Sequence, residues 1–342
     1  MNLARSAHWR EDEVHAGEGL DKVRSAVARY TLTEPTSRAE FEEGFALLDA
    51  TFGPTGEIET AEMLGRWFGS GSLSARSAPI RAHYHMVLAR DTERNGEIAG
   101  VRDCFVTVDE SQQAPEGGRA HVLLSHSLVL PAHRRTGVGA LLRHVPIALA
   151  RQHLVHRHSP DLRPQILLFA EMDQVVAADR ITVIRLLAYG RAGFRVIPPT
   201  ILPFAQPDFR DEVQHGDVPP CPLPFLCVVR DVGNNAAYLD SSRVRDVVDH
   251  ALAVHRCHAR GDHLDAIRDH ALGAVAVHEN AHGTGPIALI DLPTGPLEVG
   301  MLAPLLRAVT FPLYPPTWRG DEPLAQPDDE LAALIREWSA AG

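Results

Sequence analysis

A basic, glycine-rich turn between two apolar runs constrains the fold of this chain more than any other feature. Residues 122–130 are typical of a buried strand, residues 140–150 are typical of a helix, and between them the chain contains Arg134-x-x-Gly137-x-Gly139. Glycines let the backbone approach a ligand closely. Free N–H groups at a helix start donate to phosphate oxygens, and the helix dipole adds positive potential there. The order strand, turn, helix therefore predicts a site for a pyrophosphate.

Hydrophobic periodicity in the rest of the first two thirds predicts a mixed sheet with helices on both faces. Ser37-x-x-Glu40 is a capping box before apolar residues at helical spacing, so a helix begins near Ser37 and ends at the Gly-Pro pair 53–54. Asn95-Gly96 indicates a hairpin turn. Further helices are expected at about 57–68, 140–150 and 180–191, and strands at 80–90, 97–108, 121–130, 165–171, 195–197 and 225–230. The predicted fold class is α/β (α+β), with a mixed, mostly antiparallel sheet.

Three stretches of the chain differ in character. Residues 1–29 are polar and rich in His and Glu, which indicates a loose N-terminal leader or a short helix. Residues 30–232 hold the predicted sheet and include, before the last predicted strand, a Pro-rich segment with eight prolines between 198 and 224 that is expected to be a long ordered loop. Residues 233–342 are expected to form a helical C-terminal domain of unknown role, with helices at 243–259, 263–277, near 301–309 and at 328–338.

Composition narrows the class of protein. The formal charge of −11 argues against a general binder of nucleic acid or of an anionic membrane, because both need a basic face. The first 15 residues lack the apolar segment of a signal peptide, and no apolar run reaches the ~18 residues that a membrane span needs. The four cysteines form no CxxC pair, which is typical of reduced, buried thiols in a cytoplasmic protein.

Two motifs together resemble the GNAT superfamily of acyl-CoA-dependent N-acyltransferases. The first is the strand end Val129-Leu130-Pro131 followed by the glycine turn and a helix. The second is Tyr189-Gly-Arg-Ala-Gly193-Phe194, some fifty residues further on, where family members end a helix with Leu-Tyr-x-x-x-Gly-Phe. The strand at 166–170 lies between the two, as it does in the family. The resemblance covers roughly residues 30–231.

The resemblance implies acetyl-CoA, or another acyl-CoA, as cosubstrate. Backbone N–H groups of the turn would hold the CoA pyrophosphate, and two arginines would add charge near the phosphates. The pantetheine would pair with the exposed backbone at the end of the preceding strand, where the family splays two parallel strands apart. The residues expected to contact the cofactor are Leu128, Val129, Leu130, Arg134, Arg135, Thr136, Gly137, Val138 and Gly139.

The resemblance also implies catalytic roles. Acyl transfer to an amine needs a base for the ammonium proton, a donor for the oxyanion and an acid for the leaving thiolate. Tyr189 would be the acid, and a backbone N–H of the splayed strand would be the oxyanion donor. Many members carry a Glu where this chain has Ser125, so the base is open between the adjacent His126 and Glu171, with His83 and His85 as weaker candidates. Thr182 also replaces an Asn of many members.

A competing motif lies near the C-terminus. His278-Glu279-x-x-His282 is a literal HExxH, which on a helix places two imidazoles on one face with a glutamate beside a metal-bound water. With 19 histidines in the chain such a match arises by chance, and Ala288 stands where a longer zinc motif needs its third His. We therefore expect no metal.

The sequence as a whole predicts an N-acyltransferase that moves an acetyl or other short acyl group from CoA to an amine by direct attack in a ternary complex. The acceptor is expected to be a small molecule or a peptide, with no nucleic acid or membrane partner, and a homodimer is possible. The loop 198–224 and the first two helices should wall the acceptor site. The alternatives are a non-catalytic acyl-CoA sensor or scaffold and, further off, a zinc hydrolase that uses residues 278–282.

Overall fold

The computed structural model describes residues 2–6, 8–55, 58–70, 73–74, 80–109, 118–155, 164–173, 180–207, 223–234, 236–256 and 261–295. They form two compact units. The first comprises Met1–Ala170, Asp231–Asn235 and His250–His258, and the second comprises Glu171–Arg230, Ala236–Asp249 and Ala259–Gly342. The predicted domain limits at residues 30 and 233 stay predictions.

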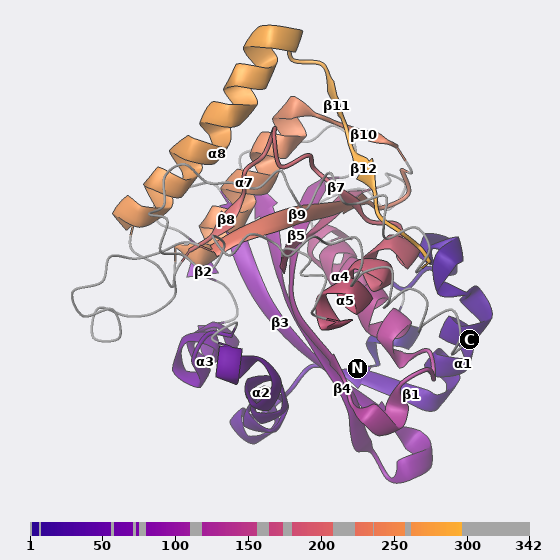
Figure 1. Cartoon of the computed structure of the whole chain (residues 1–342). Helices are drawn as coiled ribbons and strands as arrows, with labels where there is room; N and C mark the ends of the chain where they lie inside the picture. The colour runs from indigo at the N-terminus through magenta and orange to yellow at the C-terminus, as the bar shows by residue number, and fades with distance from the viewer. Residues whose placement is uncertain are drawn as a thin grey trace. The chain divides into compact units, whose positions relative to one another are not determined.

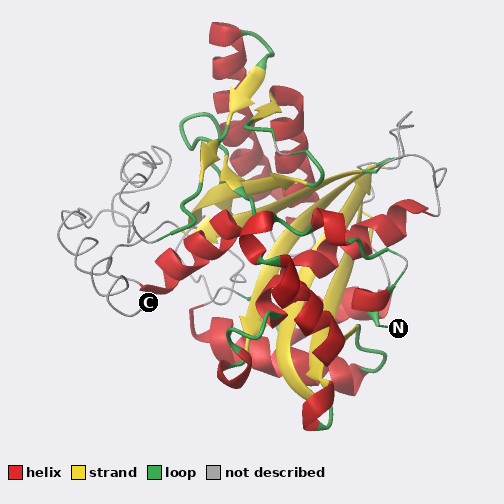
Figure 2. Ribbon diagram, turned by 90° about the vertical axis from the view of Figure 1, so that its right-hand side faces the viewer, coloured by secondary structure: helices red, strands yellow, loops and turns green. Residues whose placement is uncertain are grey.

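The first unit is built on a strongly twisted sheet of long strands (Figures 1 and 2). Its strands are β1 (Tyr30–Thr33), β2 (Leu73–Ser74), β3 (Ile80–Asp91), β4 (Glu97–Asp109), β5 (Arg119–Val129) and β6 (Gln165–Asp173, in this unit as far as Ala170). The order is β1-β3-β4-β5-β6, and β2 pairs with the outer part of β3. Pairing is antiparallel from β1 to β5 and parallel between β5 and β6. This confirms the mixed, mostly antiparallel sheet.

The hairpin between β3 and β4 turns where the sequence predicts it. Asn95, with φ 54°, and Gly96, with φ 79°, both occupy the left-handed region and complete the loop between the paired residues Asp91 and Glu97. Only glycine and, less readily, asparagine reach that region without a large steric penalty. The Asn-Gly pair therefore lets the chain turn from β3 into β4.

Helices cover both faces of this sheet. Gly44 of α2 (Arg38–Phe52) lies so close to Leu88 that a Cβ atom there would be 2.7 Å from the leucine side chain. Gly100, paired with Ala89, faces Leu142 of α4 (Val138–Val155) in the same way, at 2.9 Å. Neighbouring residues of a strand point to opposite faces, so α2 and α4 pack on opposite sides of β3 and β4. The predicted helices on both faces are confirmed.

The start of α2 follows its sequence signal. The Ser37 hydroxyl accepts the N–H of Glu40 at 3.2 Å. The Glu40 carboxylate reaches back to the N–H of Thr36 at 2.6 Å, one residue earlier than in a standard capping box. One free donor of the helix start and the N–H of the residue before the N-cap are thus satisfied, and α3 (Ala61–Ser70) follows after a short break.

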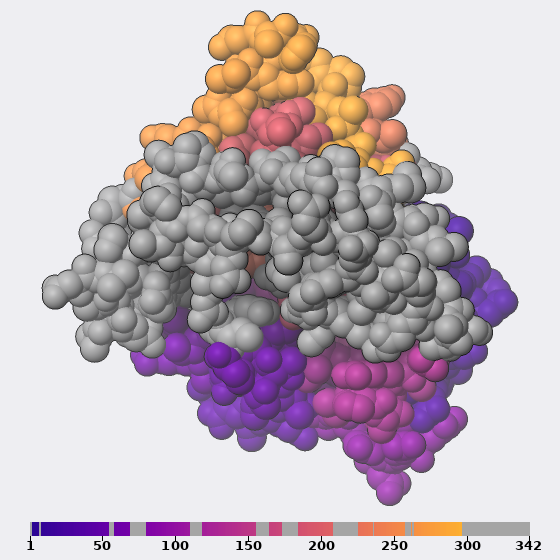
Figure 3. All heavy atoms as spheres, in the orientation of Figure 1, coloured from indigo at the N-terminus to yellow at the C-terminus, as the bar shows by residue number. Residues whose placement is uncertain are grey.

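The N-terminal residues are folded onto the first unit. They form short 3₁₀ turns at Leu3–Arg5, Glu11–Glu13 and Ala16–Glu18, and then α1 (Leu20–Arg29), which leads directly into β1. The short helix was among the expectations, but β1 was not, because four residues are too few for a clear strand pattern. Figure 3 shows the indigo atoms of this segment beside the magenta atoms that follow residue 130.

The N-terminal segment is held to α4 by ion pairs. The Glu18 carboxylate accepts from Arg143 at 2.8 Å and lies 2.5 Å from the ring of His144. Burial alone would raise the pKa of Glu18, but the hydrogen bond and charge of His144, with those of Arg143, lower it to about 2. The carboxylate is fully buried, so these partners are what make its burial tolerable.

The second unit combines short strands with the C-terminal helices. Strand order is β9-β7-β12, with β8 on β9 and a separate β10–β11 ribbon. Its elements are α5 (Arg180–Arg191), β7 (Arg195–Val196), β8 (Ala205–Gln206), β9 (Leu223–Asp231), β10 (Tyr238–Asp240), the first part of α7 (Ser241–His255), α8 (Gly261–His282), β11 (Pro286–Ala288) and β12 (Ile290–Asp291). The helices predicted at 243–259 and 263–277 are confirmed as α7 and α8.

Some predicted features fall outside the described residues. The helices expected near 301–309 and at 328–338 do so, as does most of the Pro-rich segment 208–222. Within the part of the chain that the structure describes, none of the helices combines the length and the apolar character needed to cross a membrane.

Candidate functional site

The turn after β5 has the backbone conformation that its glycine motif predicts. A 3₁₀ turn at Pro131–His133 follows β5, and α4 begins at Val138. Between them, Arg135 has φ 67° and Gly137 has φ 89°, both in the left-handed region. For Arg135 this conformation is strained by about 1–2 kcal/mol, whereas for glycine it is nearly free. The turn therefore contains one residue, Gly137, whose identity the backbone requires.

The two glycines of the motif differ in their surroundings. A Cβ atom at Gly137 would lie 2.4 Å from the backbone oxygen of Lys22 in α1, closer than any real contact. A Cβ atom at Gly139 would lie 3.5 Å from Val129, an ordinary van der Waals distance. Gly137 is thus needed for the close approach of α1 to the turn. Gly139 is not required by such a close contact, and its lack of a side chain adds no atoms over the start of α4.

Buried side chains fix the turn from beneath. The Tyr30 hydroxyl donates to the Thr136 hydroxyl at 3.0 Å and lies 3.3 Å from Nδ1 of His133. Thr136 in turn donates to the carbonyl of His133 at 2.7 Å. Asp91, which is paired with Arg29 at 2.6 Å, lies 3.4 Å from the same His133 nitrogen. The hydrogen bond from Arg29 lowers the pKa of Asp91. The ionised Asp91 carboxylate therefore lies beneath the turn, beside His133.

The outer side of the turn is suited to an anion. The N–H groups of residues 138–140 have no acceptor inside the helix, because the first bond of α4 runs from Leu141 to Gly137 at 3.1 Å. Arg134 and Arg135 are exposed, and among the described residues neither has a recorded ion pair. Free donors, a helix N-terminus and two guanidinium groups are the combination that binds phosphate groups.

The parallel pairing of β5 and β6 stops part-way along β5. It runs from Arg119–Gln165 to Leu123–Phe169, and no further β6 partner is recorded for β5 within the described residues. Beyond that point Ser127 is exposed and residues 128–130 are half-buried. The predicted pantetheine segment therefore has a partly open backbone edge beside the basic turn.

A β-bulge lies in β5 where this pairing ends. Arg102 of β4 pairs with Ser127, but Cys104 pairs with Leu124, so two residues of β5 face the single residue Asp103. The bulge frees the N–H of His126 from the ladder, and the Asp103 carboxylate accepts it at 2.6 Å. The bulge thus brings a predicted catalytic residue against a carboxylate.

Asp103 is the centre of a buried polar cluster. Its two oxygens lie 3.1 and 3.2 Å from Nδ1 of His126, and the Tyr84 hydroxyl donates to Oδ2 at 3.2 Å. The Phe52 ring packs against the imidazole, with ring centres 5.0 Å apart. Burial, followed by the nearby Asp103 charge, raises the pKa of Tyr84. A carboxylate in an apolar strand is tolerated here because three donors satisfy it.

Glu59 is the second buried acid near this cluster. It lies in the segment between α2 and α3 and is 8% exposed. Burial raises its pKa, while the neighbouring His126 and His255 act in the opposite direction. A buried carboxyl group with a raised pKa beside a histidine is a common feature of catalytic sites.

Of this cluster, sequence reasoning found only His126. Asp103 could have been noticed as a carboxylate inside the apolar run 98–108, since buried acids are rare without partners. Tyr84 and Glu59 carry no local signal. Their relation to His126 depends on the register of three strands and on the fold of the α2–α3 connection.

The two weaker base candidates lie on the other face of the sheet. His85 pairs with Cys104, whereas Asp103 pairs with Met86, so His85 and Asp103 point to opposite sides. Nδ1 of His85 lies 2.6 Å from Glu34, and its Nε2 lies 2.8 Å from His153 of α4. His83 stacks on the same His153 ring at 4.1 Å. The structure therefore does not bring His83 and His85 together with His126.

The second motif forms the end of α5 in the second unit. Gly193 has φ 78°, its N–H donates to the carbonyl of Gly190 at 2.9 Å, and the N–H of Phe194 donates to that of Tyr189 at 3.0 Å. These two bonds are a Schellman motif. The Tyr189 and Phe194 rings meet edge-to-face at 5.0 Å, which explains why Tyr, Gly and Phe occur at this spacing. Glu171, in β6, is half-buried in the same unit.

The HExxH segment forms the last turn of α8. Glu279 is ion-paired with Arg245 of α7, whose Nε lies 3.2 Å from the carboxylate, and this hydrogen bond lowers the pKa of Glu279. His282 is exposed, and its ring lies 4.9 Å from that of His278. The glutamate is thus engaged in joining two helices. Within the described ranges, no group of three or more metal-binding side chains is arranged to hold an ion.

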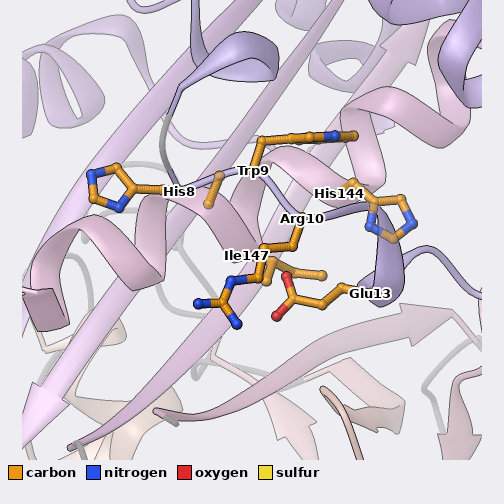
Figure 4. A pocket seen from close by; sticks show the side chains of 7 residues that line it. His8, Trp9, Arg10, Glu13, His144 and Ile147 are labelled. Atoms are coloured by element: carbon orange, nitrogen blue, oxygen red, sulfur yellow. The ribbon is translucent and has the colours of Figure 1, made fainter. Parts of the chain in front are cut away.

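A small hollow separates the N-terminal segment from α4 (Figure 4). Its lining residues are His8, Trp9, Arg10, Glu13, His144, Ile147 and Ala148. The Trp9 and His144 rings meet edge-to-face at 5.8 Å. None of these residues belongs to the turn or to the bulge, so the hollow is a feature of the N-terminal packing.

Comparisons with known proteins give matches among solved structures. No protein-family model matches the sequence, and no curated protein does. Seven chains of solved structures match. One is a GCN5-related glucosamine N-acetyltransferase region of a fungal multi-domain GH3 β-N-acetylglucosaminidase, with 17% identity, a TM-score of 0.33, and coverage of 49% of this chain and 17% of that one.

Two further matches are plant proteins in complex with bisubstrate analogues. Naa50 of Arabidopsis thaliana is 12% identical, with a TM-score of 0.30 and coverage of 58% of this chain and 97% of the other. NAA60 of Arabidopsis thaliana is 13% identical, with a TM-score of 0.33 and coverage of 60% and 98%.

Within the described residues, the order and pairing of the chain's own elements agree with the GNAT resemblance: β5, the basic turn, α4 and the parallel β6, followed by α5 with its Tyr-x-x-x-Gly-Phe end. Identities of 12% to 17% and TM-scores near 0.3 carry no argument of their own about acceptor or mechanism. The fungal chain is also matched over only 17% of its length.

Proposed function

We propose that the protein is a GNAT-type N-acyltransferase that uses acetyl-CoA or another short acyl-CoA. The observation that carries the proposal is the end of β5–β6 pairing at Leu123–Phe169, next to a basic turn at a helix N-terminus. Donors at a helix N-terminus suit the pyrophosphate of a nucleotide-bearing thioester, and the resemblance implies that an open strand edge pairs with its amide-containing arm. This chain has the two side by side.

The donor side involves residues of β5 and of the turn. Backbone N–H groups at the start of α4 and the exposed guanidinium groups of Arg134 and Arg135 bind the pyrophosphate. The half-buried strand end pairs with the pantetheine. The full set is Leu128, Val129, Leu130, Arg134, Arg135, Thr136, Gly137, Val138 and Gly139.

The reaction is direct attack of an amine on the thioester carbonyl. His126 takes a proton from the attacking amine, the new C–N bond forms, and the C–S bond breaks. The GNAT resemblance gives Tyr189 the role of protonating the leaving thiolate, and it gives a backbone N–H of β5 the role of stabilising the oxyanion. Glu171 is the alternative base. The buried Asp103 contact supports His126 for this role, because a carboxylate stabilises the imidazolium that forms.

The test is binding followed by turnover. Acetyl-CoA is titrated by calorimetry up to about 1 mM, the upper range of common KM values, and thiol release is then followed with a panel of primary amines. Binding together with amine-dependent release supports the proposal. Tyr189→Phe should keep binding and lose turnover by about 10²–10⁴-fold. Absence of binding would overturn the proposal.

A second candidate is a non-catalytic acyl-CoA sensor. Ser125, in place of the glutamate that many members carry, favours it. A sensor would bind acetyl-CoA with the same turn and release no thiol with any amine. The same titration and turnover measurements therefore separate the two functions.

A further inference from the structure

We propose that Asp103 is a positioning residue that holds the His126 ring with its proton on Nδ1, so that Nε2 is the basic nitrogen. The inference rests on the proposed function, in which His126 is the base. Asp103 contacts no substrate and acts only through the imidazole of His126. Neither the glycine motif nor the tyrosine motif points to it.

The geometry around Asp103 leaves one hydrogen-bond pattern. An ionised carboxylate can only accept hydrogen bonds. Nδ1 of His126 lies 3.1 and 3.2 Å from its two oxygens, so this nitrogen must carry the proton that it donates. A neutral imidazole has one N–H, and Nε2 is then left with the lone pair that can accept a proton.

The same carboxylate also fixes the backbone that carries the ring. It accepts the His126 N–H at 2.6 Å, which the bulge has removed from the β4–β5 ladder. One side chain thus positions both the main chain and the ring of a single residue. The Phe52 ring, 5.0 Å from the imidazole, restrains it on another side.

The charged and titratable groups around His126 come from several elements. Tyr84 of β3 donates to the second Asp103 oxygen at 3.2 Å. Glu59, from the segment before α3, is buried and interacts electrostatically with His126, with Asp103 and with His255 at the end of α7.

Asp103→Asn is the direct perturbation. The amide is isosteric and can still accept the His126 N–H, but its NH₂ group now donates towards Nδ1 and favours the opposite tautomer. In serine proteases the equivalent Asp→Asn change keeps the geometry and lowers turnover by about 10⁴-fold through the wrong tautomer. We expect kcat to fall by about 10²–10⁴-fold with KM for acetyl-CoA changed less than about threefold.

Tyr84→Phe is the matched control. It removes a hydrogen bond from the same buried carboxylate but leaves both contacts to His126. If Asp103 only stabilised the sheet, the two variants would lower kcat alike. We expect Tyr84→Phe to lower kcat less than about tenfold, and equal losses in the two variants would overturn the proposal.

The tautomer itself is measured in the unmodified protein. Long-range ¹H–¹⁵N spectra of histidine-labelled protein report which ring nitrogen is protonated, and the His126 signals are assigned as those lost in His126→Gln. An Nδ1–H tautomer that changes in Asp103→Asn supports the inference, and an Nε2–H tautomer in the unmodified protein overturns it. If the tautomer is as expected and no amine is acylated, only the proposed function fails.

The double variant Asp103→Asn/His126→Gln tests whether the effect of Asp103 on kcat passes through His126. If Asp103 acts through His126, Asp103→Asn should lower kcat no further in a His126→Gln background. A full additional loss there would show that Asp103 acts by another route. Thermal unfolding of all four proteins identifies any variant that is not folded.

Discussion

Substitution of the two motif glycines by alanine should have different effects on stability. Gly137→Ala places a side chain at φ 89° and a Cβ atom 2.4 Å from the Lys22 oxygen. The left-handed backbone costs about 1–2 kcal/mol and the overpacking about 1–3 kcal/mol, so the free energy of unfolding should fall by about 2–5 kcal/mol. That is a large part of the ~5–15 kcal/mol of a typical protein.

Gly139→Ala is the control within the same motif. Its Cβ atom would meet Val129 at 3.5 Å, and the residue lies in the first turn of α4. Alanine is favoured over glycine in a helix by up to about 1 kcal/mol, so stability should be unchanged or slightly higher. Because the added methyl group would make only ordinary van der Waals contacts, acetyl-CoA binding should also be retained.

Urea unfolding followed by circular dichroism measures both variants. With a slope of about 2–3 kcal/mol/M, Gly137→Ala should lower the midpoint by about 0.7–2.5 M, and Gly139→Ala should leave it unchanged. Equal losses in the two variants, or no loss in Gly137→Ala, would show that neither the left-handed backbone nor the approach of α1 constrains residue 137.

Three further variants test the turn and the packing of the N-terminal segment on α4. The double variant Arg134→Glu/Arg135→Glu should weaken acetyl-CoA binding at least about tenfold. Because both side chains are exposed, the free energy of unfolding should change by less than about 0.5 kcal/mol per site. Arg66→Glu, exposed on α3, is the control for the charge change, and an equal weakening of acetyl-CoA binding by it would refute the assignment. Tyr30→Phe removes the hydrogen bond to Thr136 and should lower the free energy of unfolding by about 0.5–1.5 kcal/mol and weaken acetyl-CoA binding, as calorimetry would show. Glu18 has a folded pKa of about 2, below its ordinary value of 4.5, so its stabilising effect is complete above about pH 4.5 and is lost as the pH falls towards 2. Glu18→Gln should therefore flatten this acid limb of the stability curve, and an unchanged acid limb in urea titrations at several pH values would contradict the pairing with His144.

The sequence predicts the features whose causes are local. The capping box at Ser37, the Asn-Gly turn at residues 95–96 and the glycine turn before α4 each depend on residues within a few positions of one another. The spacing of Tyr189, Gly193 and Phe194 is also local, because a Schellman motif joins these residues across one helix end. These elements occur where the pattern predicted them.

The support beneath the site depends on long-range register and could not be predicted. Tyr30 reaches Thr136, 106 positions later, only because β1 pairs with β3 and so lies beneath the turn. The Asp103–His126 contact requires a bulge in β5, and the pattern of apolar residues does not reveal an extra residue in one strand. A register shifted by one position would have placed Asp103 on the opposite face.

Pairing with acidic side chains determines which arginines can bind a ligand. With a net charge of −11, the chain offers more acids than bases, and most arginines near α4 are neutralised by them. Arg143 is paired with Glu18, and the buried Arg151 is paired with Glu13, both acids of the N-terminal segment. Arg134 and Arg135 are exposed at the start of the same helix, and the described residues record no acid paired with either. An acidic protein can thus bind an anion at one point, because its carboxylates neutralise the surrounding arginines and leave a localised positive potential where the free N–H groups lie.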